Sequence, residues 1–375
     1  MFFIFFIAVF IVFNTGIILF YRNLLPKGKR ATLIMVSALV IVCLSFLFER
    51  IFPHLPEMPV VKWLTSLGSI YIGVMLYLFI GAIIGESIII THGFLKHLSA
   101  GQRNLFRKKI SYAMVLLTAV IVVGSHINTY FPTVAEYAVT VRKPCKIGSL
   151  KIVMVSDVHA GNLVGKNKID RLAEEIMKCR PDMVIIAGDL FDRSISVVRH
   201  DAMMERLKKI RPKYGIWFAL GNHDYFDNSD KAEEMAESLG ITVLRDKTVL
   251  VANSFYLAGR EDASVNRRHP VKRKDLSDIL VGVDTKKPLI IIDHQPKAID
   301  ESIQNGADLV LSGHTHDGQF FPLNLFLKIF YRVPYGCKRI GDTDFIVSSG
   351  FGTWGPPIRN TGRTEITDIM ITFKK

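Results

Sequence analysis

The sequence predicts a chain of two parts, an N-terminal region of four membrane-spanning helices and a C-terminal α/β domain. Long apolar runs with few charges fill the first third of the chain. After residue 150, short β-branched runs alternate with amphipathic helical patterns, and clusters of Asp, Asn and His follow the short runs. We therefore expect a transmembrane region over residues 1–130, a linker over 131–149 and the α/β domain over 150–375.

Each predicted span is an apolar run of about the length that crosses a bilayer as a helix. The four runs are Phe2–Tyr21, Ala31–Phe48, Leu67–Ile90 and Ile110–Ile127. A cleaved signal peptide is the alternative for the first run, but it lacks a basic N-terminal region and a clear cleavage site. Buried helices of a soluble bundle would show a polar face, and these runs show almost none.

Loop charge predicts the orientation of these spans. Up to Tyr130 there are eleven Lys and Arg against three Asp and Glu, mostly in the loops after the first and third spans. Basic loops stay in the cytoplasm, so an even number of spans places both termini and the α/β domain outside it, with the chain in the inner (cell) membrane. Bases in short loops between apolar spans favour anionic lipid headgroups as partners over nucleic acid.

Glu86 and the four cysteines are interpreted as structural residues. Glu86 lies inside the third span, near its predicted cytoplasmic end, where its side chain can reach the interface. A role in transport would rest on this residue alone. The four cysteines show no paired spacing, so neither a disulfide framework nor a cysteine zinc site is expected.

The second part of the chain alternates strand and helix patterns. Expected strands are Lys151–Ser156, Met183–Ala187, Ile216–Leu220, Leu289–Ile292 and Leu309–Leu311, and expected helices are Ile169–Cys179, 201–210, 231–239 and Ile299–Gln304. Residues 132–148 fit a linker or an edge strand. The alternation predicts strands buried on both faces, with a site at their C-terminal ends.

Five polar clusters follow these strands. They contain Asp157 and His159; Asp189; Asn222, His223 and Asp224; His294; and His314 and His316. Carboxylate, amide and imidazole groups are ligands for borderline divalent metals. Seven such donors can hold two cations about 3.5–4 Å apart, the separation that serves in-line displacement at phosphorus.

In this order the clusters resemble the motifs of the calcineurin-like metallophosphoesterase superfamily, from about Leu150 to the C-terminus. The resemblance implies two mixed β-sheets packed as a sandwich and flanked by helices. It implies two divalent cations, such as manganese, iron or zinc, and a bridging hydroxide as the nucleophile. The first metal would be held by Asp157, His159, Asp189 and His316, and the second by Asp189, Asn222, His294 and His314. His223 would assist the leaving group or steady the transition state, with Asp224 orienting its ring.

Segments 313–319 and 350–359 look like those of a bacterial membrane-associated branch related to UDP-2,3-diacylglucosamine pyrophosphatases of lipid A synthesis. That branch usually has glycine at the position of Asp317, which puts the loop conformation or charge beside the metals in question. Two further stretches bear on the substrate. The run 320–331 fits either packed core or a membrane-facing, acyl-chain-binding lip. Arg267, Arg268, Lys272, Arg273 and Lys274 form either a solvated loop or a headgroup contact.

The resulting hypothesis is a binuclear metallophosphoesterase that cleaves a phosphodiester or diphosphate in a membrane-associated, lipid-linked substrate. UDP-2,3-diacylglucosamine is the alternative substrate, and it would require a cytoplasmic site. A soluble phosphoester, with the membrane only a tether, is a third reading. A metal-binding pseudoenzyme or lipid sensor is the alternative of another class, although this chain keeps all seven predicted ligands and His223.

Overall fold

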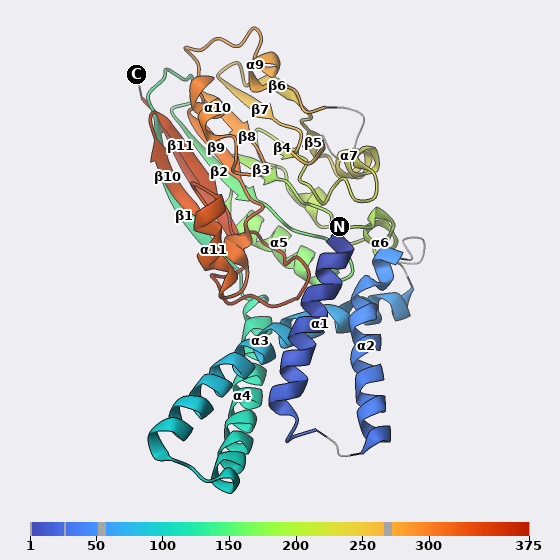
Figure 1. Cartoon of the computed structure of the whole chain (residues 1–375). Coiled ribbons are helices and arrows are strands. Elements are labelled where there is room, and N and C mark those ends of the chain that lie inside the picture. Colours follow the sequence, from blue (N-terminus) through green and yellow to red (C-terminus); the bar gives the residue numbers. More distant parts are fainter. Residues whose placement is uncertain (1, 26–27, 52–57, 266–271, 375) are drawn as a thin grey trace. The chain divides into compact units, whose positions relative to one another are not determined.

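The computed structural model describes residues 2–25, 28–51, 58–265 and 272–374 (Figure 1). The chain divides into two compact units: a helical unit of residues 1–127 with 355–358, and an α/β unit of residues 128–354 with 359–375. Four charged residues of the predicted loops lie outside the described residues: Lys27, Glu57, Arg267 and Arg268.

The helical unit contains α1 (Phe2–Tyr21), α2 (Lys29–Ile51), α3 (Pro59–Lys96) and α4 (Ala100–Asn128). Within the described residues, three helical stretches are long and apolar enough to cross a membrane: Lys29–Phe46, Pro59–Lys96 and Ala100–Asn128. Helix α1 contributes the apolar stretch Ile7–Tyr21, which is shorter than the about 20 residues that a crossing helix needs. The part of the chain that the structure describes therefore offers three candidate spans and not the four that were predicted.

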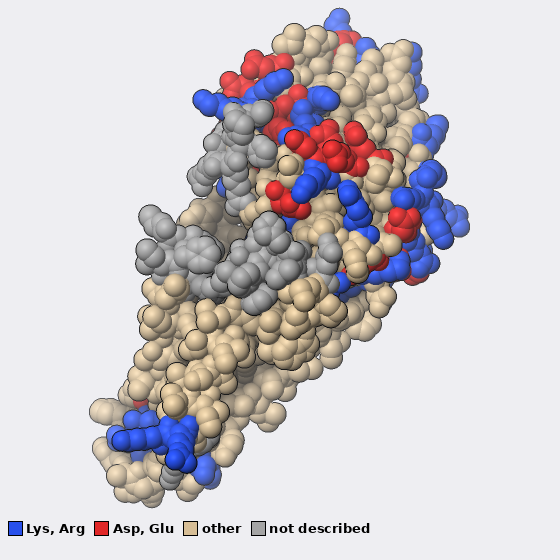
Figure 2. Space-filling model, turned by 90° about the vertical axis from the view of Figure 1, so that its right-hand side faces the viewer, with Lys and Arg blue, Asp and Glu red and all other residues tan. Residues whose placement is uncertain are grey.

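The α1–α2 and α3–α4 connections lie at the same end of the helical unit. Asn23 Nδ2, just after α1, donates a hydrogen bond to Asn104 Oδ1, near the start of α4, at 2.9 Å. On the face shown in Figure 2, the helical unit carries few charges apart from Lys and Arg gathered at one end. In the same α3–α4 hairpin, both carboxylate oxygens of Glu86 accept from Arg107, at 2.5 and 2.6 Å. Glu86 therefore has a charged partner within the helical unit.

The α/β unit contains two six-stranded sheets, ordered β1-β12-β2-β3-β4-β5 and β10-β11-β9-β8-β7-β6. The strands of the first sheet are β1 (Thr133–Val141), β12 (Glu365–Phe373), β2 (Ser149–Val155), β3 (Met183–Ala187), β4 (Ile216–Ala219) and β5 (Thr242–Val243). Those of the second are β10 (Gly336–Ile340), β11 (Thr343–Val347), β9 (Leu309–Ser312), β8 (Leu289–Ile292), β7 (Phe255–Gly259) and β6 (Lys247–Val251). Both sheets mix parallel and antiparallel pairs, as the resemblance implied.

Strand β1 corrects the domain boundaries. It pairs in parallel with β12, with Thr133 opposite Glu365, and forms the edge of the first sheet. Residues 133–141 of the predicted linker are therefore an edge strand of the domain, which is the alternative that the sequence left open for this segment. Its partner lies at the far end of the chain, so local sequence offered no sign of the pairing.

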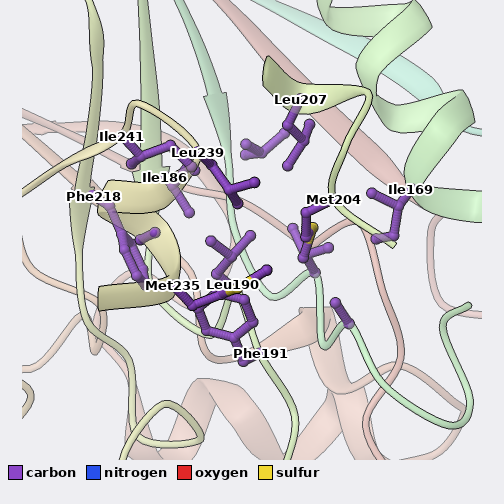
Figure 3. Close-up of a cluster of buried hydrophobic side chains, with 14 of the residues drawn as sticks. Ile169, Ile186, Leu190, Phe191, Met204, Leu207, Phe218, Met235, Leu239 and Ile241 are labelled. Atoms are coloured by element: carbon purple, nitrogen blue, oxygen red, sulfur yellow. The ribbon is translucent and has the colours of Figure 1, made fainter. Parts of the chain in front are cut away.

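Three apolar cores build the layers of this unit. One lies between the two sheets, and a second lies between the first sheet and α5 (Lys166–Cys179) and α7 (Ser229–Ser238); Figure 3 shows part of the second. The third packs α9 (Leu276–Ile279) and α10 (Ile299–Gln304) on the second sheet. The remaining helices are short: α6 (Ile195–His200), α11 (Leu323–Phe330) and the 3-10 turns Leu207–Lys209 and His316–Gly318. The helix expected over 201–210 forms turns instead, because α6 ends before it.

Candidate metal centre

The predicted ligands follow five strands at nearly constant spacing. Asp157, Asp189, His294 and His314 each come two residues after the last residue of β2, β3, β8 and β9, and Asn222 comes three after β4. Strands β2, β3 and β4 are mutually parallel, as are β8 and β9, so their C-terminal ends meet along one edge of the sandwich. The two sheets thereby bring residues from 157 to 316 into one site.

The backbone turns sharply at these positions. Five predicted ligands have left-handed backbone conformations: Asp157 (φ 53°), His159 (φ 51°), Asp189 (φ 53°), His314 (φ 69°) and His316 (φ 52°). A non-glycine residue in this region costs about 1–3 kcal/mol and persists only where its surroundings impose it. Residues with such conformations concentrate at functional sites, and here all five are residues that the sequence predicts to bind a metal.

Three ligand atoms converge in a first group. His316 Nε2 lies 3.1 Å from His159 Nε2 and 3.2 Å from Asp157 Oδ1. His159 Nε2 lies 3.9 Å from Asp157 Oδ1 and 3.8 Å from Asp189 Oδ2. Two imidazole nitrogens facing each other at this distance, with a carboxylate beside them, are the donor set of a cation site.

A second group forms around Asp189. His294 Nε2 lies 3.3 Å from Asp189 Oδ2, and Asp157, Asp189 and His294 have ligand atoms within 4.8 Å of one another. The His314 ring centroid is 5.2 Å from that of His294. Asp189 is thus within reach of both groups, as expected for a bridging carboxylate.

The residues present fit two cations. Asn222 Oδ1 and His294 Nε2 are buried, and neither makes a hydrogen bond within the described part of the chain. Such orphaned buried polar atoms carry a cost of about 1–3 kcal/mol unless another group binds them. Two glycines also stand where the predicted ligands leave no room for a side chain. A Cβ on Gly221 would lie 2.2 Å from Asp189 Oδ1, and one on Gly313 would lie 2.3 Å from Asp157 Oδ2.

Protonation favours metal binding at several ligands. Burial, aided by the charge of His223, lowers the pKa of His159 to about 3, and burial together with His294 lowers that of His314 to about 4. Neutral imidazole is the form that binds a metal. Burial raises the pKa of Asp189, but the neighbouring His294 and His223 rings outweigh it and hold the pKa well below its ordinary value. Burial lowers the pKa of His294, but the charges of Asp189 and Asp157 outweigh it and raise the pKa well above its ordinary value. The site therefore presents an ionised Asp189 and neutral His159 and His314 rings, whereas His294 has to release its proton before it can bind a metal.

His223 is held by a residue that sequence reasoning missed. Its Nδ1 lies 2.8 Å from Asp192 Oδ1, and Asp192 lies three residues after Asp189 on the same loop. Burial lowers the pKa of His223, but the charges of Asp189 and Asp192 outweigh it and leave the pKa raised. An acidic residue on the loop of a metal aspartate was the only signal for this contact in the sequence.

The role predicted for Asp224 was wrong. Its carboxylate accepts three backbone N–H groups, from Gly221 at 2.7 Å, Asp189 at 2.9 Å and Phe191 at 3.0 Å. It thereby ties the loop after β4 to the loop after β3. Asp224 organises the backbone of the site, and Asp192 is the residue that orients His223.

Arg359 contacts the predicted ligand His316. It is fully buried, and its Nη1 donates to the His316 carbonyl at 3.1 Å, while Nη2 lies 3.3 Å from His316 Nδ1. The neighbouring Asp317 has φ 48° and ψ 36°. Glycine is the residue best suited to this conformation, and aspartate is one of the few others that tolerate it. The departure at Asp317 therefore preserves the loop conformation and changes its charge.

A cavity of about 300 Å³ opens at the centre and has two kinds of wall. One wall carries Asp189, Asn222, His223, His314 and His316, and the other carries Leu323, Leu327, Tyr331 and Trp354. Helix α11 supplies part of the apolar wall, and none of its residues is buried, which excludes the packed-core reading of that helix. In the predicted basic run, Arg273 is paired with Asp293 at 2.5 and 3.0 Å and serves the fold.

Comparison with known proteins identifies the family. A family model described as calcineurin-like phosphoesterase matches residues 150–318. An uncharacterized metallophosphoesterase of Aquifex aeolicus is 31% identical over 252 residues, which cover 67% of this chain and 95% of that protein. The chain belongs to the calcineurin-like phosphoesterases. Members of this family are hydrolases that act on phosphoester bonds with two divalent metals, as the sequence indicated.

The names of two relatives of this phosphoesterase combine a metallophosphoesterase domain with a transmembrane protein. Proteins called "Transmembrane protein with metallophosphoesterase domain" from Danio rerio and Bos taurus are both 34% identical to it, over 270 and 275 residues. These matches cover 68% and 69% of this chain and 61% of each relative, so the chain spans about three fifths of their length. Membrane association is supported by these names and by the apolar helices.

Proposed function

We propose that this phosphoesterase hydrolyses a phosphodiester or diphosphate bond in a lipid-linked substrate. The observation that carries the proposal is the cavity, which joins the metal-centre residues to an apolar wall. A phosphate group suits the first wall, and a hydrocarbon chain suits the second. A wholly polar substrate would leave Leu323, Leu327 and Trp354 without a counterpart.

The metal centre would be divided as the resemblance implies. Asp157, His159, Asp189 and His316 would hold one cation, and Asp189, Asn222, His294 and His314 the other. When bound, the cations would supply Lewis acidity at the phosphoryl group and lower the pKa of water. The fixed positions of Asp157 and Asp189, set by backbone N–H donors from His314 and His223, keep the two groups of ligands in register.

His223 would carry the proton for the leaving group. Asp192 accepts from Nδ1 and so leaves Nε2 as the atom that can face the substrate in the cavity, which His223 lines. As the phosphorus–oxygen bond breaks, the proton on Nε2 would pass to the departing oxygen. The raised pKa of His223 keeps this proton in place at higher pH than an ordinary histidine allows.

The charge pattern supports a catalytic domain outside the cytoplasm. Basic residues flank the α1–α2 and α3–α4 connections, and the contact between Asn23 and Asn104 brings both to one end of the helical unit. If that end is cytoplasmic, α4 runs to the opposite side before the domain begins. The side on which the domain lies depends only on α4, the last helix before it, so three spans and four spans lead to the same side.

The alternatives from the sequence make different demands. UDP-2,3-diacylglucosamine would require the domain on the cytoplasmic side, and the names of the relatives do not indicate that substrate. Protease access to a C-terminal tag in intact and lysed spheroplasts decides the side. Cleavage in intact spheroplasts supports the extracytoplasmic placement, whereas protection until lysis would make the nucleotide-linked lipid the leading substrate.

Substrate class is tested with purified full-length protein in detergent micelles. We expect Leu327→Ala, in the apolar wall, to raise KM for a phosphatidylglycerol-type phosphodiester by about tenfold, because hydrocarbon contacts are lost. Hydrolysis of bis(p-nitrophenyl) phosphate should stay within about twofold. Val281→Ala, on a side chain that is 84% exposed, is the matched control. Equal effects on both substrates would contradict a lipid-linked substrate, and two bound metals without any turnover would favour the pseudoenzyme.

A further inference from the structure

Helix α11 has a second apolar face, turned away from the cavity. Leu323 and Leu327 line the cavity, whereas Leu325, Phe326, Ile329 and Phe330 are exposed by 57, 52, 73 and 73% of their surface. Positions i, i+1, i+4 and i+5 share one side of a helix, so these four side chains form one patch, here called the outer face of α11. A patch of large apolar side chains in solvent marks an interaction site.

Hydrogen bonds within the α/β unit link the start of α11 to Asn128. Asn128, the last residue of α4, donates from Nδ2 to the carbonyls of Arg359 at 2.9 Å and Gly362 at 3.0 Å. Asn360, between them in the chain, accepts from the backbone N–H of Phe321 at 2.8 Å. Phe321 comes two residues before α11 and is itself 51% exposed.

This anchoring connects the outer face to the bilayer. Helix α4 contains a stretch long and apolar enough to cross a membrane, so Asn128 marks the point where the chain leaves it. Two hydrogen-bonded links join that point to the start of α11, and α11 is only eight residues long. The exposed apolar face therefore belongs to a helix that these hydrogen bonds link to the last residue of α4.

We propose that the outer face of α11 inserts into the interfacial layer of the bilayer that the chain's own helices cross. Aromatic and aliphatic side chains on one side of a short helix suit burial about 5–10 Å into the headgroup and acyl boundary. Lys328 is exposed on the polar side of α11, the side that stays in water when the outer face is inserted. Leu323 and Leu327, on the adjoining side of the same helix, line the cavity, so docking would bring the cavity to headgroup level.

The inference goes beyond the proposed function, because docking requires no hydrolysis. It is tested on full-length protein with its four cysteines replaced, reconstituted in nanodiscs of phosphatidylcholine and phosphatidylglycerol. Single cysteines are introduced by Ile329→Cys and Phe330→Cys on the outer face and labelled with an environment-sensitive fluorophore. Lys328→Cys on the polar side of the same helix and Val281→Cys on a distant surface are the matched controls.

A lipid-borne nitroxide should quench the label at positions 329 and 330 at least about threefold more than at 328 and 281, and aqueous iodide should show the reverse order. Equal iodide quenching at all four positions would overturn the proposal. Protection from both quenchers would also overturn it, because the face would then be covered by protein, either a second copy or another segment. Loss of lipid hydrolysis with the quenching pattern intact would instead count against the proposed function alone.

Discussion

Asp192 Oδ1 lies 2.8 Å from His223 Nδ1 and 3.9 Å from His159 Nδ1, so one carboxylate faces both a proposed proton donor and a metal ligand. The closer contact has the distance of a charge-assisted hydrogen bond, and the longer one does not. Asp192 is therefore a positioning residue for His223. Asp192, His159 and His223 also place possible ligand atoms within 4.8 Å of one another, so metal content is the measurement that separates positioning from metal binding.

Replacing Asp192 should separate catalysis from metal binding. We expect Asp192→Asn to lower kcat by about 10²-fold, because the His223 ring loses both its orientation and its charge partner. Metal content, measured by elemental analysis, should remain at the wild-type value. A fall in metal content matching the fall in rate would contradict this assignment.

Asp192→Asn should also shift the pH dependence of kcat in a defined direction. Asp189 and Asp192 raise the pKa of His223, so its acidic form persists to higher pH than in an ordinary histidine. Removing the Asp192 charge should lower that pKa, and the alkaline limb of the kcat profile should move to lower pH. An alkaline limb that stays in place would show that His223 does not supply the proton.

Asp224 should matter for folding more than for proton transfer. Asp224→Ala leaves the N–H groups of Gly221, Asp189 and Phe191 without their acceptor, and we expect a loss of about 2–4 kcal/mol in the free energy of unfolding. Asp342→Asn, at a fully exposed position, is the control and should change stability by less than about 0.5 kcal/mol. Denaturant unfolding of the two variants gives the comparison, and equal stabilities would contradict the role given to Asp224.

Asp317 offers a test of backbone strain. Its left-handed conformation should be relieved by Asp317→Gly and worsened by Asp317→Val, since a β-branched residue fits that conformation poorly. We expect the glycine variant to be within about 1 kcal/mol of wild type or more stable, and the valine variant to lose about 1–3 kcal/mol. Thermal unfolding orders the three proteins. A valine variant as stable as wild type would show that the loop does not need this conformation.

Much of the domain could be predicted because its strands are short, buried and apolar. The local sequence indicates the strands that end at Val155, Ala187, Ile292 and Ser312, and a predicted metal ligand follows each of them. The partner of β1 could not be predicted, because Thr133 pairs with Glu365 across most of the chain. A local pattern specifies a strand but not its neighbour.

The candidate site also has features that the sequence predicts and features that it does not. Residue type and spacing select the seven ligands, because few other arrangements use such donors at strand ends. The partner of His223 depends on how two loops meet in space, and Asp224 was the nearer residue in sequence but not in the structure. The exposure of α11 also depends on tertiary packing, since an apolar helix reads alike whether it is buried or at a surface.

The central claim is a two-metal phosphoesterase centre bridged by Asp189. The most direct test measures metal content and bis(p-nitrophenyl) phosphate hydrolysis together, on purified full-length wild type and Asp189→Ala. We predict about two divalent cations per wild-type chain, and in the variant a lower metal content with a rate reduced by at least about 10³-fold. Turnover retained by Asp189→Ala, or a wild-type enzyme fully active after chelation, would contradict the account.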